Sequence, residues 1–328
     1  MVGGFLPCQE LMRTRNKIIN IAGALLSVCA FWFVGSKVFL NWSMITTWPR
    51  QQVPFWTVVF SAACVYASAS FSLSFAWSLL LRFLGQTEVD FRLWHAIYAR
   101  TQIAKYAPGN IFHFAGRHVW GKKAGISHSV LVGATVLEAL GLVSAACAVS
   151  LIGFVSGSQI FGNARWYLLG LLTALFLPFI TVTAVKYIRP LQLPNVSTRP
   201  LTEILRPLFR AYSLYILFFA ISGGILLWLV GLVGGTPDIK MSGIVFSAYA
   251  ASWIGGYVTP GSPAGLGVRE SLVIIILNGI MAEPMALLVA LALRCITITG
   301  DLLYFTTSFI TIRQLKNKIS PTGHLETK

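Results

Sequence analysis

Two blocks of this sequence, 152 residues apart, repeat the same order of helix-breaking and cationic residues. Each block has a proline, then a glycine and, nine residues after the proline, an arginine: Pro108, Gly109 and Arg117 in the first block, and Pro260, Gly261 and Arg269 in the second. Proline lacks the backbone donor that a helix needs and glycine leaves the backbone free, so each pair predicts a helix break. A break and a cation within apolar sequence predict a duplicated polar site at membrane depth.

The chemistry that such a block favours is anion binding. Asn110 and Ser262 stand two residues after the prolines, where either can cap a new helix, and Pro263 suits the first helical position. Arg117 and Arg269 follow these caps by seven residues, about two turns, on the same helix face. Free amides, the helix dipole and a guanidinium would together hold a phosphate or carboxylate. The alternative is a plain helix break with an arginine that extends to lipid headgroups.

Two further polar residues lie near these blocks or within apolar sequence. His113 stands four residues before Arg117, on the same helix face, where it could carry a proton or donate to a headgroup; a structural role is the alternative. Glu138 is alone among Val, Leu and Ala. An isolated carboxylate in hydrocarbon is costly, so we expect it to contact Arg117 or Arg269.

Arg294 and Asp301 stand seven residues apart on one apolar segment and are a possible ion pair. Signatures of catalysis are missing: the sequence has no G-x-S-x-G, no H-E-x-x-H, no P-loop and no D-x-D. The five cysteines and five histidines show no ligand spacing, so neither a metal site nor a cofactor is expected.

Composition places the chain among polytopic membrane proteins. Of its 328 residues, 56% are hydrophobic and 11% charged, and its mean hydropathy is +0.74. The net charge of +15 could indicate nucleic-acid binding in a soluble protein. Here most basic residues fall in short loops between apolar runs, which is typical of loops that face anionic lipid, so nucleic acid is not an expected partner.

Six apolar segments are long enough to cross a bilayer, which takes about 20 helical residues. They are residues 18–40, 54–84, 126–156, 166–188, 208–233 and 284–310. Two further regions, 94–124 and 241–282, contain the Pro-Gly breaks. If the N-terminus is cytoplasmic, the inner loops and termini hold 19 of the 25 Lys and Arg residues. This asymmetry predicts a plasma (inner) membrane protein with both termini in the cytoplasm.

The order of these segments predicts two inverted repeats, residues 1–160 and 161–328, within one all-α membrane domain. Each repeat would have three spanning helices and one re-entrant hairpin with its Pro-Gly tip near the midplane. Three spans, an odd number, put the second repeat in the opposite orientation. The alternative has eight full spans, in which residues 241–258 and 263–281 each cross the membrane.

Several of these residues resemble a known family. KYAPG at 105–109, GR at 116–117, GIS at 125–127 and LE at 137–138 are similar to the first motif block of the lysylphosphatidylglycerol synthetase transmembrane-region family, also called flippase-like. PG at 260–261 with PAGLGVRE at 263–270 resembles its second block. Some members carry an aminoacyltransferase domain after the membrane region; here we expect the membrane domain alone.

The resemblance implies translocation of a polar lipid between the membrane leaflets. Its partners would be membrane lipids, anionic, zwitterionic or polyprenyl-linked, held by the hairpin residues. Two alternatives remain open: a membrane-embedded transferase that acts on a lipid-phosphate, and an accessory protein of a lipid-glycan pathway. The identity of the lipid, the direction of transport and the oligomeric state stay open as well.

Overall fold

The computed structural model describes residues 54–85, 90–107, 111–156, 200–235, 238–259 and 262–319, together with single helical positions between 32 and 43. This part of the chain is mostly helical and contains no strand.

Four long helices form the frame: α3 (Phe55–Phe83), α6 (His128–Ser156), α9 (Leu201–Leu232) and α12 (Glu283–Ile319). Each is long and apolar enough to cross a membrane, which is consistent with an integral membrane protein. They confirm four of the six predicted spanning segments. The other two, 18–40 and 166–188, lie outside the described residues apart from single positions in the first.

The two interrupted regions fold as pairs of shorter helices. The first contains α4 (Phe91–Gln102), the 3₁₀ helix η2 (Ile103–Tyr106) and α5 (Phe112–Lys123). The second contains α10 (Ile239–Val258), η3 (Pro263–Gly265) and α11 (Val268–Leu277). Helices therefore end on both sides of each predicted break, while the tip residues themselves are outside the described residues: Pro108, Gly109, Asn110, Pro260 and Gly261.

These helices are shorter than the four long helices of the frame. α4 and α5 have 12 residues each and α11 has 10. At about 1.5 Å per residue they rise roughly 15–18 Å, about half the thickness of a hydrocarbon core. The 20-residue α10 is the longest of the four.

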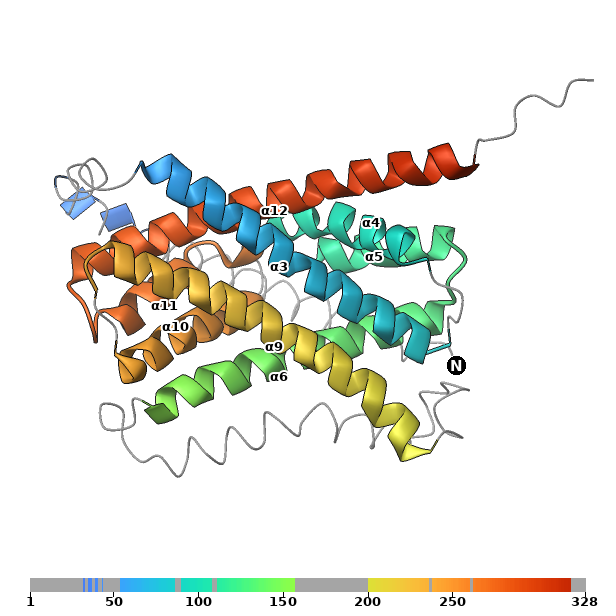
Figure 1. Ribbon diagram of the computed structural model, residues 1–328, viewed down its shortest axis with the longest axis horizontal. Coiled ribbons are helices and arrows are strands. Elements are labelled where there is room, and N and C mark those ends of the chain that lie inside the picture. The colour runs from blue at the N-terminus through green and yellow to red at the C-terminus, as the bar shows by residue number, and fades with distance from the viewer. Residues whose placement is uncertain are drawn as a thin grey trace, which may run out of the picture.

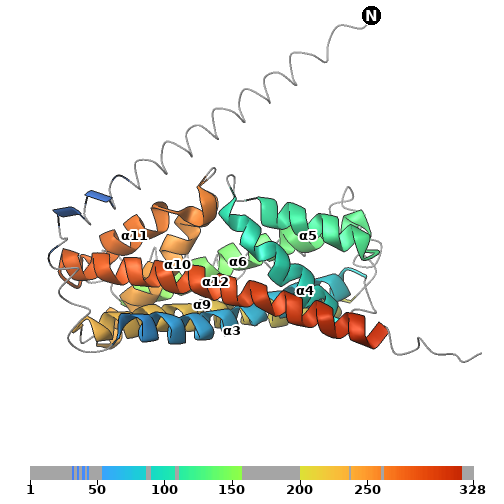
Figure 2. The ribbon, with the colours of Figure 1, turned by 90° about the horizontal axis from the view of Figure 1, so that it is seen from above.

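The two pairs lie at opposite ends of the molecule. In Figures 1 and 2, α4 and α5 lie at the end where α12 finishes, and α10 and α11 lie at the end where it begins. The pairs meet in the middle, where η2 contacts η3. The elements that flank the two breaks are therefore neighbours in space.

Small residues allow the closest helix contacts. A Cβ added at Gly153 of α6 would lie 1.8 Å from the carbonyl oxygen of Gly243 on α10. The hydroxyl of Ser247 on α10 donates to the carbonyl of Ser150 on α6 at 2.5 Å. Gly300 of α12 allows a similar approach to Tyr66 of α3. Backbone contact of this kind is common between helices in membranes.

Candidate functional site

The first cluster closes around Arg117 of α5. Its guanidinium forms an ion pair with Glu138 of α6, and the two residues are 2% and 0% exposed. Tyr98 of α4 donates to the second carboxylate oxygen of Glu138 at 2.7 Å. The guanidinium also lies 4.0 Å from the centroid of the Tyr98 ring. Of the two arginines expected to contact Glu138, Arg117 is therefore the one that does. The pair has no net charge and is buried.

His113 lies one turn before Arg117 on α5 and is also buried. Its ring contacts Phe114, with 3.9 Å between the ring centroids. Its Nδ1 atom has no hydrogen-bond partner among the described residues. This position agrees with either role considered for it, so a functional role of His113 stays a prediction. The same holds for Asn110, which is outside the described residues.

The second cluster begins with a correction to the predicted helix start. Ser262 does not begin the helix that carries Arg269. It precedes the three-residue η3, and its hydroxyl donates to the carbonyl of Leu266 at 3.0 Å. The helix is interrupted because Gly265 and Gly267 have φ angles of 72° and 81°, which no α-helix contains. α11 therefore begins at Val268.

Arg269 consequently lies in the first turn of α11 instead of two turns after a cap. Two glycines make room for its side chain. A Cβ at Gly256 of α10 would lie 2.5 Å from Cγ of Arg269, and one at Gly265 would lie 2.8 Å from its Nε. The guanidinium carbon is 5.7 Å from the centroid of the Trp253 ring. Within the described ranges, no carboxylate forms an ion pair with Arg269, and its Nε has no hydrogen-bond partner.

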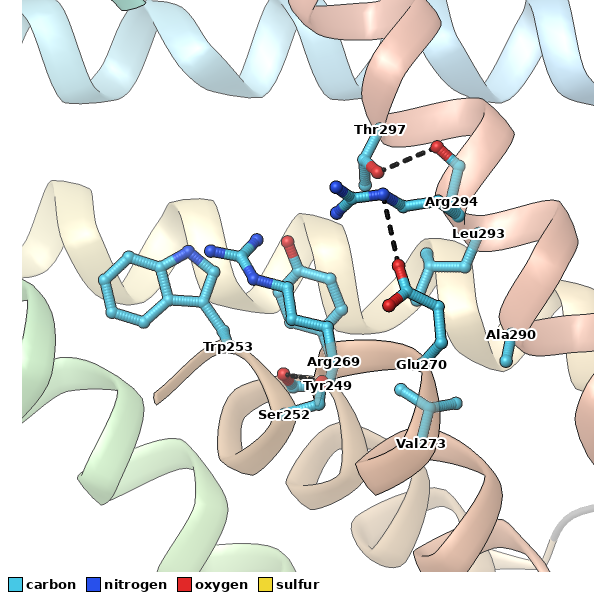
Figure 3. Close-up of a pocket in the computed structure, with 10 residues that line it drawn as sticks. All are labelled: Tyr249, Ser252, Trp253, Arg269, Glu270, Val273, Ala290, Leu293, Arg294 and Thr297. Carbon is cyan, nitrogen blue, oxygen red and sulfur yellow. Dashed lines mark hydrogen bonds and ion pairs between the residues drawn. The ribbon is translucent and has the colours of Figure 1, made fainter. Parts of the chain in front are cut away.

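The carboxylate nearest in sequence, Glu270, is turned away from Arg269. One of its oxygens accepts from the Gly267 amide at 2.6 Å, which caps α11. The other lies 3.1 Å from Nε of Arg294 on α12. Figure 3 shows the Glu270 carboxylate facing Arg294, while the guanidinium of Arg269 lies beside Trp253.

The predicted ion pair between Arg294 and Asp301 is wrong. Arg294 pairs with Glu270, and Asp301 pairs with Lys105 of η2, whose Nζ is 2.7 Å from Oδ2. Seven residues along one helix separate two side chains by about 10 Å. Neighbouring elements place closer partners beside both of them.

Asp301 joins two distant parts of the chain. Lys105 contacts both carboxylate oxygens, at 2.7 and 2.8 Å, and the Tyr106 hydroxyl donates to Oδ2 at 2.6 Å. The guanidinium of Arg294 lies 5.7 Å from the centroid of the Tyr106 ring. The Asp301 contacts therefore adjoin the Arg269 cluster. Analysis of the sequence missed Lys105 as a site residue, although it stands three residues before Pro108.

The Arg269 cluster borders a pocket between α10, α11 and α12. Its lining includes Trp253, Arg269, Glu270, Arg294 and Thr297 (Figure 3). The Glu270–Arg294 and Lys105–Asp301 pairs are each neutral, so one positive charge remains, on Arg269. The chemistry that this arrangement supports is the binding of an anion.

The described residues contain no group of three or more His, Cys, Asp or Glu side chains that could hold a metal ion. No family model matches the chain, and a comparison with curated proteins finds no significant match. Function must therefore be argued from the geometry of the two clusters.

Proposed function

We propose that the protein moves an anionic or zwitterionic polar lipid between the membrane leaflets, and that Arg269 binds its headgroup. One observation carries this proposal. The Arg269 guanidinium borders a pocket, and no carboxylate among the described residues pairs with it. An uncompensated cation within a membrane protein is costly and usually serves a ligand or an ion path. A planar guanidinium can bind two phosphate oxygens at once.

Arg117 has a different part in this proposal. Its charge is already balanced by Glu138, and it is 2% exposed. A headgroup that bound Arg117 would have to displace Glu138 first. The initial contact is therefore assigned to Arg269, and Arg117 would take part only in a conformation in which the first cluster opens. The motif resemblance to a flippase-like family agrees with this function.

The proposal includes a topology. The α4/α5 and α10/α11 pairs would be re-entrant hairpins of two inverted halves, which enter from opposite membrane faces. Three observations support it: the short lengths of α4, α5 and α11, the placement of the pairs at opposite ends in Figures 1 and 2, and the contact between η2 and η3. Opening between the halves would then break the Lys105–Asp301 contact.

Cysteine labelling tests the topology. Lys122 and Lys240 are exposed at the ends of α5 and α10. In a chain whose native cysteines are replaced, we expect Lys122→Cys to react with an impermeant thiol reagent from the cytoplasmic side only. Lys240→Cys should react from the outer side only. Labelling of both positions from the same side would overturn the opposed hairpins.

Lipid transport is tested with purified protein in liposomes that contain a headgroup-labelled phospholipid. We expect the protein to speed exposure of the label in the outer leaflet, and Arg269→Lys, which keeps the charge and loses the planar fork, to slow it. Arg210→Lys, an exposed arginine of α9, is the matched control. Exposure no faster than in protein-free liposomes would refute the proposal, and a chemically altered lipid would favour a transferase.

A further inference from the structure

The geometry points to Glu270 and Arg294 as the residues that limit the pocket to a single negative charge, so that it favours a phosphodiester over a diphosphate. This inference rests on the proposed function, because it describes how the same pocket selects its lipid. Both residues are positioning residues: they determine how much charge Arg269 presents to a ligand.

The first step is the charge balance. Three cations, Arg269, Arg294 and Lys105, face two carboxylates, Glu270 and Asp301, so the net charge of these described residues is +1. The break residues Pro108, Gly109, Asn110, Pro260 and Gly261 carry no charge and so do not enter this number. In a low-dielectric interior, one negative charge on the ligand restores neutrality, whereas two or more leave an unbalanced excess.

The second step is the supply of donors. Lys105 already contacts both oxygens of Asp301, and the charge of Arg294 is balanced by Glu270, whose carboxylate lies 3.1 Å from Nε. Nη1 of Arg294 lies 3.4 Å from the carbonyl oxygen of Ala264. Among the described residues of this cluster, Arg269 is therefore the cation whose charge no carboxylate balances. One guanidinium fork matches two oxygens of one phosphate group, and a second phosphate would meet no further uncompensated cation.

The third step explains why Arg269 stays free although a glutamate follows it directly. One carboxylate oxygen of Glu270 accepts from the Gly267 amide at 2.6 Å, and the other lies at ion-pair distance, 3.1 Å, from Nε of Arg294. Without Arg294, the carboxylate would be free to turn toward Arg269 and compete with the headgroup. Arg294 therefore keeps the binding cation available, and Glu270 keeps the surplus charge at one.

The experiment compares two ligands with the same tail. Farnesyl methyl phosphate carries one negative charge and farnesyl diphosphate carries more than one, and binding of each to the full chain in detergent is measured by titration calorimetry. We expect the wild type to bind the phosphodiester at least about tenfold more tightly. Glu270→Gln adds one positive charge to the pocket and should reduce this preference about tenfold or reverse it.

Two variants complete the design. Glu203→Gln changes the total charge equally at an exposed position of α9 and should leave the preference unchanged. Arg294→Gln frees Glu270 and should weaken phosphodiester binding about tenfold, which keeps the inference testable if Glu270→Gln fails to fold. A wild type that prefers the diphosphate overturns the inference. So does a folded Glu270→Gln with the wild-type preference, or an Arg294→Gln with wild-type phosphodiester affinity.

The result also separates this inference from the transport proposal. If the phosphodiester preference depends on Glu270 but the labelled lipid does not change leaflet in liposomes, the pocket selects as inferred and the transport function fails. If the lipid changes leaflet and the preference does not depend on Glu270, transport stands and the selection by charge is wrong.

Discussion

The two arginines that close the repeated sequence blocks occupy opposite electrostatic situations. Arg117 is buried under a carboxylate from α6 and a tyrosine from α4. Arg269 borders a pocket, and the glutamate next to it in sequence pairs with Arg294 instead. The comparison teaches that equal spacing along the chain does not give equal electrostatic surroundings. Residues of other helices, Glu138 on α6 and Arg294 on α12, determine whether each guanidinium has a carboxylate partner.

The largest expected effect is a loss of stability when Arg117 loses its carboxylate partner. Glu138→Leu leaves Arg117 buried without a counter-charge and should destabilise the protein by about 3–5 kcal/mol. Unfolding in detergent, followed by circular dichroism, measures this. The double variant Arg117→Met/Glu138→Leu should recover most of the loss, because it removes both charges. If Glu138→Leu were as stable as the wild type, the ion pair would contribute little to stability. The Arg117 and Arg269 sites would then not differ in this respect.

The second effect is weaker ligand binding when Arg269 is changed. Arg269→Gln should leave stability near the wild-type value, because it removes no ion pair from the described structure. It should weaken phosphodiester binding by about 1.5–3 kcal/mol, the usual contribution of a hydrogen bond to a charged group. Calorimetric titration with farnesyl methyl phosphate provides the value. Strong destabilisation with unchanged binding would reverse the roles assigned to the two arginines.

The third effect tests how Arg269 is accommodated. Gly256→Ala places a Cβ 2.5 Å from Cγ of Arg269 and 3.0 Å from the Cα of Gly265, so the side chain must move. We expect a cost of about 1–3 kcal/mol in stability and weaker anion binding. Gly224→Ala, where a Cβ meets nothing within 4 Å, is the matched control. Equal behaviour of the two variants would show that the space beside Arg269 is not restricted.

The smallest effect concerns the contact between the clusters. Tyr106→Phe removes one hydrogen bond to Asp301 but leaves Lys105 in place. The expected loss of stability is about 1.5 kcal/mol, the low end for a hydrogen bond to a charged group, because Lys105 still contacts both oxygens. Chemical unfolding of the variant measures it, beside Tyr257→Phe, which changes the tyrosine three residues before Pro260. A loss of several kcal/mol would indicate that Tyr106 holds η2 in place by itself.

Local pattern in the sequence predicts the long helices and the two interruptions, because length, hydropathy and Pro-Gly breaks are local properties. The Arg117–Glu138 contact also follows in part, since a lone buried carboxylate requires a cation. The Lys105–Asp301 pair does not follow, because it joins residues 196 positions apart through tertiary packing. The start of α11 was misplaced because Gly265 and Gly267 adopt positive φ angles that helix-capping rules do not foresee.

The close seam between α6 and α10 has a mechanical consequence. Gly153 lies against the backbone of Gly243, and Ser247 bonds to the carbonyl of Ser150, so these helices touch main chain to main chain. Separating them would leave the Ser247 hydroxyl without its acceptor, whereas rotation about their line of contact would keep this bond. If the molecule rearranges, we expect the α6–α10 contact to serve as the pivot, so that the side chains farthest from it would move the greatest distance.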